Sequence, residues 1–132
     1  MNFLKGPPTP GTVELIAVSL KTMMECGIRI ECREGTEESI AHVDYVNGKW
    51  EIVIDQGAAM GADANEGNAL ALLHCLWHEF GHIYLSSFNL VPPPIPGFDN
   101  IPEEMWCDEF ASMMCDEMGA EIVGEPYLQD WR

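Results

Sequence analysis

The chain has 132 residues, with 22 Asp and Glu against 6 Lys and Arg, and a net charge of -16. A surface so poor in positive charge cannot make the phosphate contacts that drive binding to nucleic acids or to anionic membranes, so both are excluded as direct partners. Hydrophobic residues make up 47% of the chain, a composition that folds, and the length predicts a single domain over residues 1–132.

The first eleven residues contain three prolines and two glycines, which predicts a flexible lead over residues 1–11. This stretch lacks the apolar core of a secretory signal, and we expect no membrane span in the chain. Five cysteines, an odd number without a C-x-x-C pair, favour reduced thiols. We therefore expect a cytoplasmic protein.

A helix is predicted to begin at Thr12, which can cap its first turn. Apolar residues then recur at helical spacing until Gly27, which stands where a glycine commonly ends a helix. Residues 28–32, IRIEC, follow as a short predicted strand.

A β-hairpin comes next, because Asn47-Gly48 is the strongest two-residue hairpin signal and separates two alternating segments, 39–46 and 49–55. The predicted pairs are Val46 with Lys49, Tyr45 with Trp50, Val43 with Ile52 and Ala41 with Ile54. One face of this hairpin is apolar. The other face is expected to lie towards solvent or a loop.

Residues 56–67 are rich in small side chains and are expected to form a connector. A long helix is predicted over residues 68–87, with His74, His78 and His82 on the side opposite its apolar face. That apolar face consists of Ala69, Leu73, Leu76, Phe80 and Ile83.

The proline-rich segment 92–102 predicts a loop, and a further helix is predicted over residues 103–118, stopped by Gly119. The residues expected to face the core are Trp106, Phe110, Met113 and Met114. The predicted class is therefore α+β. A small antiparallel sheet of about three strands would pack on the histidine-bearing helix and on a second, glutamate-bearing helix.

The chemistry of the sequence centres on the segment from His78 to His82, which matches H-E-x-x-H within a predicted helix. Two imidazoles at i and i+4 share one helix face and can bind one Zn²⁺ at ~2.0 to 2.1 Å each. Glu79 stands beside that face, where a general base can take a proton from metal-bound water.

A catalytic zinc takes three protein ligands and keeps one position open. No third histidine follows in the metzincin spacing, so a carboxylate is the candidate. Glu104, at the start of the next helix, is the leading choice, and Glu103, Asp108 and Glu109 compete on charge alone. Glu104 and Asp108 share a helix face at i and i+4, which is expected to look towards the zinc.

The segment HEFGHIYL, followed by E-x-x-C-D-E-F-A, resembles the ImmA/IrrE group of zinc metallopeptidases. By that resemblance His78, His82 and Glu104 bind Zn²⁺, Glu79 is the catalytic base, and Asp108 orients a ligand histidine. The implied reaction is hydrolysis of a peptide bond by zinc-activated water.

The resemblance covers roughly residues 12–119 and implies a minimal zincin-like domain. Cys107 stands where the family usually has a small alanine, and no helix-turn-helix domain is recognised. Family members typically cut or regulate a DNA-binding repressor, so the resemblance implies a protein or peptide substrate such as a helix-turn-helix repressor. Such a repressor is basic, and a charge of -16 would attract it.

Several alternatives stay open at the level of the sequence. The group that stabilises the oxyanion could be His74, Tyr84 or Tyr127, and His74 could also support a ligand. The alternative function is a zinc-stabilised acidic binding module that sequesters a basic regulator without cleaving it. Peptide deformylase also uses H-E-x-x-H, but this chain lacks the segment that carries the cysteine ligand of that enzyme. The sequence does not predict an oligomeric state.

Overall fold

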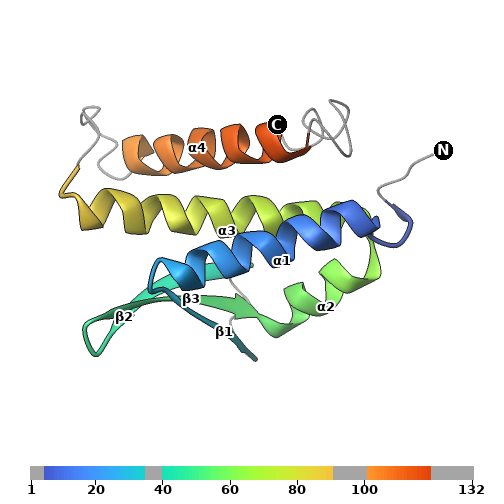
Figure 1. Cartoon of the computed structure of the whole chain (residues 1–132), viewed down its shortest axis with the longest axis horizontal. Coiled ribbons are helices and arrows are strands. Elements are labelled where there is room, and N and C mark those ends of the chain that lie inside the picture. The colour runs from blue at the N-terminus through green and yellow to red at the C-terminus, as the bar shows by residue number, and fades with distance from the viewer. Residues whose placement is uncertain (1–4, 35–39, 91–100, 120–132) are drawn as a thin grey trace.

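The computed structural model describes residues 5–34, 40–90 and 101–119, which form four helices and three strands (Figure 1). The elements are α1 (Pro10–Glu25), β1 (Arg29–Arg33), β2 (Ala41–Val46), β3 (Lys49–Asp55), α2 (Gln56–Ala64), α3 (Glu66–Ser87) and α4 (Ile101–Gly119). The predicted α+β class is confirmed. None of the helices in these ranges combines the length and the apolarity needed to cross a membrane.

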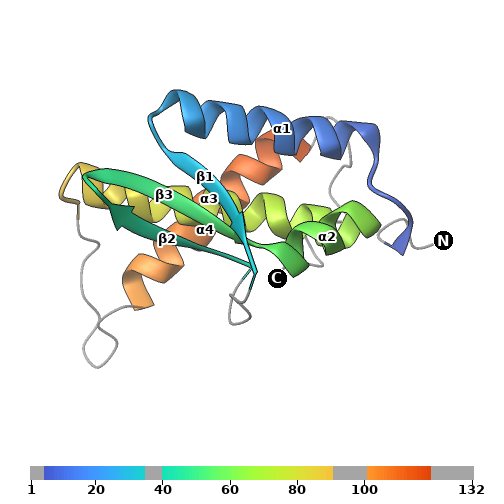
Figure 2. The ribbon, with the colours of Figure 1, turned by 90° about the horizontal axis from the view of Figure 1, so that it is seen from below.

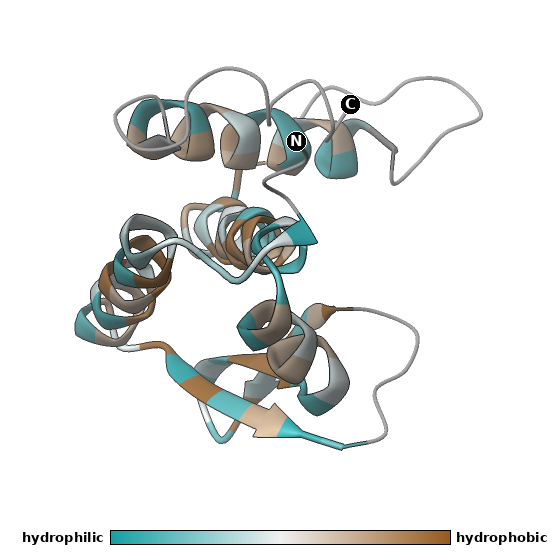
Figure 3. Ribbon diagram, turned by 90° about the vertical axis from the view of Figure 1, so that its right-hand side faces the viewer, coloured by the Kyte–Doolittle hydropathy of each residue, from teal (hydrophilic) through white to brown (hydrophobic). Residues whose placement is uncertain are grey.

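Helix α3 is the centre of the fold and lies between the sheet and α4 (Figures 1 and 2). It packs against α1, α2, α4, β2 and β3, so it is covered on several sides. Leu70, Leu72 and Trp77 are therefore buried together with most of the predicted apolar face, of which only Phe80 is partly exposed. Figure 3 shows hydrophobic residues concentrated on α3, whereas hydrophilic residues alternate with them along α4.

The sheet has the order β1-β3-β2. Strands β2 and β3 pair antiparallel in the predicted register, with Tyr45 opposite Trp50, and the positive φ of 76° at Gly48 suits the tight turn. The expectation of an entirely antiparallel sheet is wrong, because β1 pairs parallel to β3, from Arg29 opposite Glu51 onward. Since β2 occupies one edge of β3, β1 adds to the other edge, and the chain crosses between them.

The polar face of the hairpin differs from the expectation at Glu51, which is only 2% exposed. Arg33 of the neighbouring β1 donates to Glu51 Oε1 over 2.6 Å. The same guanidinium lies 4.0 Å from Asp44, the like-charged cross-strand partner of Glu51. One arginine thus offsets the repulsion between two carboxylates and covers the buried one.

Helix α1 begins two residues earlier than predicted, because Thr9 is the N-cap and Pro10 is the first helical residue. Thr12 is not the cap. Its buried hydroxyl donates instead to Glu66 Oε2 over 2.6 Å. Glu66 also accepts from the Thr9 backbone over 2.9 Å, and its own N–H donates to the Gly6 carbonyl over 2.9 Å. The part of the expected flexible lead that the structure describes is therefore tied to the start of α3 at Gly6 and Thr9.

The connector expected over residues 56–67 is wrong, because most of it forms α2. Asp55 caps this helix by accepting from the Ala58 backbone over 3.0 Å. The small side chains that suggested a connector allow α2 to pack closely on α3, where Ala62 and Ala69 are both buried.

Helix α4 presents its small residues to α3. Cys107, Ala111 and Cys115 are buried, whereas Met113, expected in the core, is 51% exposed. Phe110 and Met114 pack partly against the core, as expected. Residues 101 and 102 of the predicted proline-rich loop belong to α4, whose first turn tolerates a proline, and most of that loop lies outside the described residues.

Candidate metal centre

Two histidines project from the middle of α3 towards α4. His78 and His82 are one helical turn apart, and their ring centroids are separated by 4.9 Å. Their Nε2 atoms lie 3.2 Å from each other, so both lone pairs can converge on one point. The side chains are 14% and 19% exposed, which places them in a mostly covered but accessible position.

Helix α4 brings Glu104 to the same point. Its two carboxylate oxygens lie 2.8 Å from His78 Nε2 and 3.1 Å from His82 Nε2. Ligand atoms around a tetrahedral zinc, each at ~2.1 Å from the metal, lie about 3.4 Å apart. The separations between the ligand atoms of these three residues are similar to that value. These three residues, called the ligand triad below, each offer one ligand atom within 4.8 Å of the others. Two imidazoles and one carboxylate are a donor set that fits zinc.

The outer nitrogens of both rings also have partners on α4. His78 Nδ1 lies 2.7 Å from Asp108 Oδ1, and His82 Nδ1 lies 2.5 Å from Glu103 Oε2. The position of Asp108 beside a ligand histidine agrees with the expectation. Glu103, which sequence reasoning treated only as a competing ligand, contacts an outer nitrogen instead. The sequence offered no signal for this contact, because it depends on how α4 is rotated against α3.

Glu79 follows His78 on α3 and is half-buried. Burial raises the pKa of its carboxyl, the adjacent His78 and His82 oppose that rise, and the carboxylate of Glu104 adds to it. A carboxyl whose pKa is raised holds a proton more readily than one in water. This property suits a group that accepts and returns a proton beside a metal.

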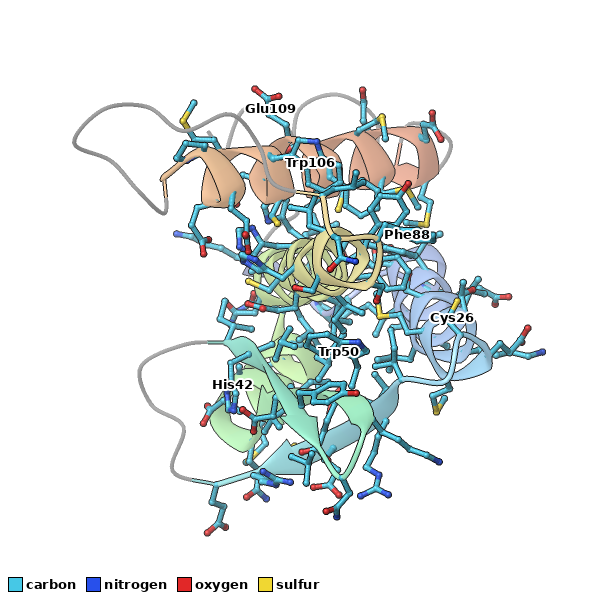
Figure 4. The ribbon with its side chains drawn as sticks, turned by 90° about the vertical axis from the view of Figure 1, so that its left-hand side faces the viewer. Cys26, His42, Trp50, Phe88, Trp106 and Glu109 are labelled. Carbon is cyan, nitrogen blue, oxygen red and sulfur yellow. The ribbon has the colours of Figure 1, made fainter. Side chains whose placement is uncertain are left out.

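The other predicted site residues lie elsewhere or outside the described residues. His74 Nε2 is 3.3 Å from Ser112 Oγ, one turn before His78, and does not belong to the ligand triad. Tyr84 stacks on Trp106, with ring centroids 6.1 Å apart, rather than beside the triad. Tyr127 lies outside the described residues. Figure 4 shows Trp106 on α4 above the end of α3.

The nearby cysteines do not extend the donor set. Burial, together with neighbouring carboxylates, raises the pKa of Cys75 to about 11 and that of Cys107 to about 12. Among the described residues, the side chains whose ligand atoms converge are His78, His82 and Glu104, and neither cysteine belongs to that group. The geometry thus favours a site with two histidines and one glutamate over the cysteine-containing site of a deformylase.

Close packing of α4 on α3 depends on Gly81, between the two histidines. A Cβ at this position would stand 3.2 Å from Cys107 Sγ and 3.4 Å from the Phe110 ring. Since those atoms would have to yield, any side chain here pushes against the helix that carries Glu104.

We expect the change in the free energy of unfolding caused by Gly81→Ala to be about 1–3 kcal/mol more destabilising in the presence of Cys107 than in a Cys107→Ala background. In that background the clash is relieved and the helix gains the better propensity of alanine. Urea unfolding of the four proteins in this double-mutant cycle measures the difference. An equal effect of Gly81→Ala in both backgrounds would contradict the packing argument.

An acidic pocket of about 550 Å³ adjoins the site through Asp108. Among the described residues, its lining consists of Asp108, Glu109, Ser112, Met113 and Asp116 of α4. Three of these five side chains are carboxylates, so the pocket would attract cationic groups.

The chain thus brings together two imidazole nitrogens and a carboxylate oxygen, with a further carboxylate on each outer nitrogen. Such a set is typical of catalytic zinc sites in which two histidines and one glutamate bind the metal. Comparisons with protein-family models, with curated proteins and with solved structures find no match to this chain. The resemblance to the ImmA/IrrE group stays a prediction.

Proposed function

We propose that this chain is a zinc-dependent metallopeptidase. The observation that carries the proposal is the convergence of His78, His82 and Glu104, from two helices, within 4.8 Å of one another. Two of these residues come from an H-E-x-x-H segment, and the glutamate of that segment stands beside them. In so acidic a chain a histidine can meet a carboxylate without a metal, so the proposal rests on the ligand triad together with the H-E-x-x-H spacing.

Each residue has a role that its position supports. The ligand triad holds the metal, and bound zinc supplies a Lewis acid that polarises a carbonyl and acidifies water. Glu79 accepts a proton from the attacking water and returns it to the leaving amine. Asp108 accepts from His78 Nδ1 and keeps the other nitrogen of the ring directed at the metal.

The substrate is proposed to be a protein or peptide with basic segments, a class that includes helix-turn-helix repressors. The charge of -16 and the acidic pocket beside Asp108 support this choice. Strand β2, an edge of the described sheet that packs on α3, offers backbone groups to an extended peptide. Five free cysteines support a cytoplasmic location.

The test of this function is the metal content of tag-free protein by inductively coupled plasma mass spectrometry, beside Glu104→Ala and Glu109→Ala. We expect about one zinc per chain in the wild type and in Glu109→Ala, and a loss of zinc in Glu104→Ala, because only Glu104 belongs to the triad. Equal zinc in all three proteins, no zinc after add-back, or iron as the bound metal would contradict the proposal.

A zinc-stabilised binding module that sequesters a basic regulator is the second candidate. The observation that favours it is the charge distribution, since no Lys or Arg occurs between Trp50 and Trp131. The two functions differ in one outcome. A module leaves its captured partner intact and does not need Glu79.

A further inference from the structure

The two histidines of the ligand triad are held in matching ways by α4. Each ring has one nitrogen, Nε2, beside Glu104 and the other, Nδ1, beside a second carboxylate of the same helix. For His78 that second carboxylate is Asp108, at 2.7 Å, and for His82 it is Glu103, at 2.5 Å. Both contacts are short enough for charge-assisted hydrogen bonds.

A neutral imidazole carries one N–H, and the nitrogen that carries it cannot bind a metal. A carboxylate beside Nδ1 keeps the proton there and leaves the Nε2 lone pair for the metal. The same contact fixes the rotation of the ring about its Cβ–Cγ bond. Because His82 is only 19% exposed, few other groups can take over this role.

We propose that Glu103 is a positioning residue that holds His82 in its Nδ1–H form, as Asp108 does for His78. This inference rests on the proposed zinc function and adds a second carboxylate to the site. Two consecutive glutamates then act on one ring from two sides: Glu103 on the outer nitrogen and Glu104 as a ligand beside the inner one.

Geometry separates this role from that of a metal ligand. Glu104 is near the Nε2 atoms of both histidines, so it can reach a metal between them. The described contact of Glu103 is with Nδ1 of His82, on the far side of the ring from that point. Glu103 is accordingly not among the residues whose ligand atoms converge.

The experiment compares zinc affinity in wild type, Glu103→Ala, Glu103→Gln and the control Glu109→Ala, by competition with a chromophoric chelator. Glu109 is an exposed acid on the same helix and points away from α3 (Figure 4), so its removal tests the loss of charge alone. We expect Glu103→Ala to bind one zinc about 10–100-fold more weakly. Glu103→Gln, which keeps a neutral acceptor, should fall between it and the wild type. Circular dichroism checks that each variant is folded.

A second readout follows the imidazole nitrogens of the zinc-loaded proteins by long-range ¹⁵N–¹H correlation spectra. Wild type should show Nδ1–H for both His78 and His82, and Glu103→Gln should alter the signals of His82 while leaving those of His78 in place. Asp108→Asn should do the reverse. The wild-type spectrum needs no substitution, so it tests the assignment even if a variant does not fold.

Three results would overturn the inference. Affinity in Glu103→Ala equal to that in Glu109→Ala would show that Glu103 does not position a ligand. Loss of zinc in Glu103→Ala but not in Glu104→Ala would make Glu103 the ligand. A wild type that binds no zinc, or a Glu104→Ala variant that keeps its zinc, would defeat the proposed function as well, whereas the first result would leave that function standing.

Discussion

Glu79→Gln is expected to lower peptide hydrolysis by about 10²–10⁴-fold while the protein keeps its zinc. Glutamine has the same shape as glutamate but cannot accept the proton of the attacking water. Zinc is retained because Glu79 is not part of the ligand triad. The measurement follows cleavage of a mixture of lysine- and arginine-rich peptides by mass spectrometry, with metal content determined on the same samples. Glu117→Gln, which removes one charge from an exposed position of α4 outside the acidic pocket, is the matched control.

A comparison of the wild type with Glu79→Gln also separates the two candidate functions. If Glu79→Gln cleaves as fast as the wild type, Glu79 is not the base. If the wild type captures a basic partner that stays intact, and Glu79→Gln captures it equally well, the chain acts as a binding module.

Glu66→Ala is expected to destabilise the fold by about 2–4 kcal/mol, because it removes a fully buried acceptor. The Thr9 backbone and the Thr12 hydroxyl both donate to this carboxylate, and alanine leaves them without it. An acid in the first turn of α3 is also lost. Urea unfolding followed by circular dichroism measures the change.

Glu14→Ala is the control for that experiment, since Glu14 is an exposed glutamate on α1 and should change stability by less than about 0.5 kcal/mol. A similarly small effect of Glu66→Ala would show that the hydrogen bonds from Thr9 and Thr12 to this carboxylate do not stabilise the fold.

The parts of the fold that depend on local sequence were predictable. Asn47-Gly48 sets the register of the hairpin, and that register is confirmed pair by pair. The parts that depend on distant partners were not. Thr12 resembles an N-cap in its local sequence, but its hydroxyl donates a hydrogen bond to Glu66, 54 positions away. The parallel pairing of β1 depends likewise on which edge of β3 remains available. The local sequence of β1 does not indicate that edge.

Small side chains misled the prediction at α2, because they suggested a connector although four of its nine residues are alanine, the strongest helix former. The helix forms because Asp55 caps it and because small side chains allow close packing on α3. The alanines, the cap and the contact with α3 together outweigh the cost of the two glycines in this helix.

The site was predictable where spacing within one helix decides geometry. The i, i+4 spacing placed His78 and His82 together, and the same spacing placed Glu104 and Asp108 on one face of α4. The role of Glu103 was not predictable, because it depends on how α4 is rotated against α3. That rotation is set by buried contacts such as the one between Gly81 and Cys107.

The mixed sheet also has a consequence for the order in which its strands pair during folding. Strands β2 and β3 are joined by two residues, so closing their loop costs little conformational entropy. Strand β1 pairs with β3 across the whole intervening strand, from Arg29 to Glu51, and needs the free edge of β3 to be present first. We therefore expect the hairpin to form before β1 pairs with it, and the burial of Glu51 beside Arg33 to follow that pairing.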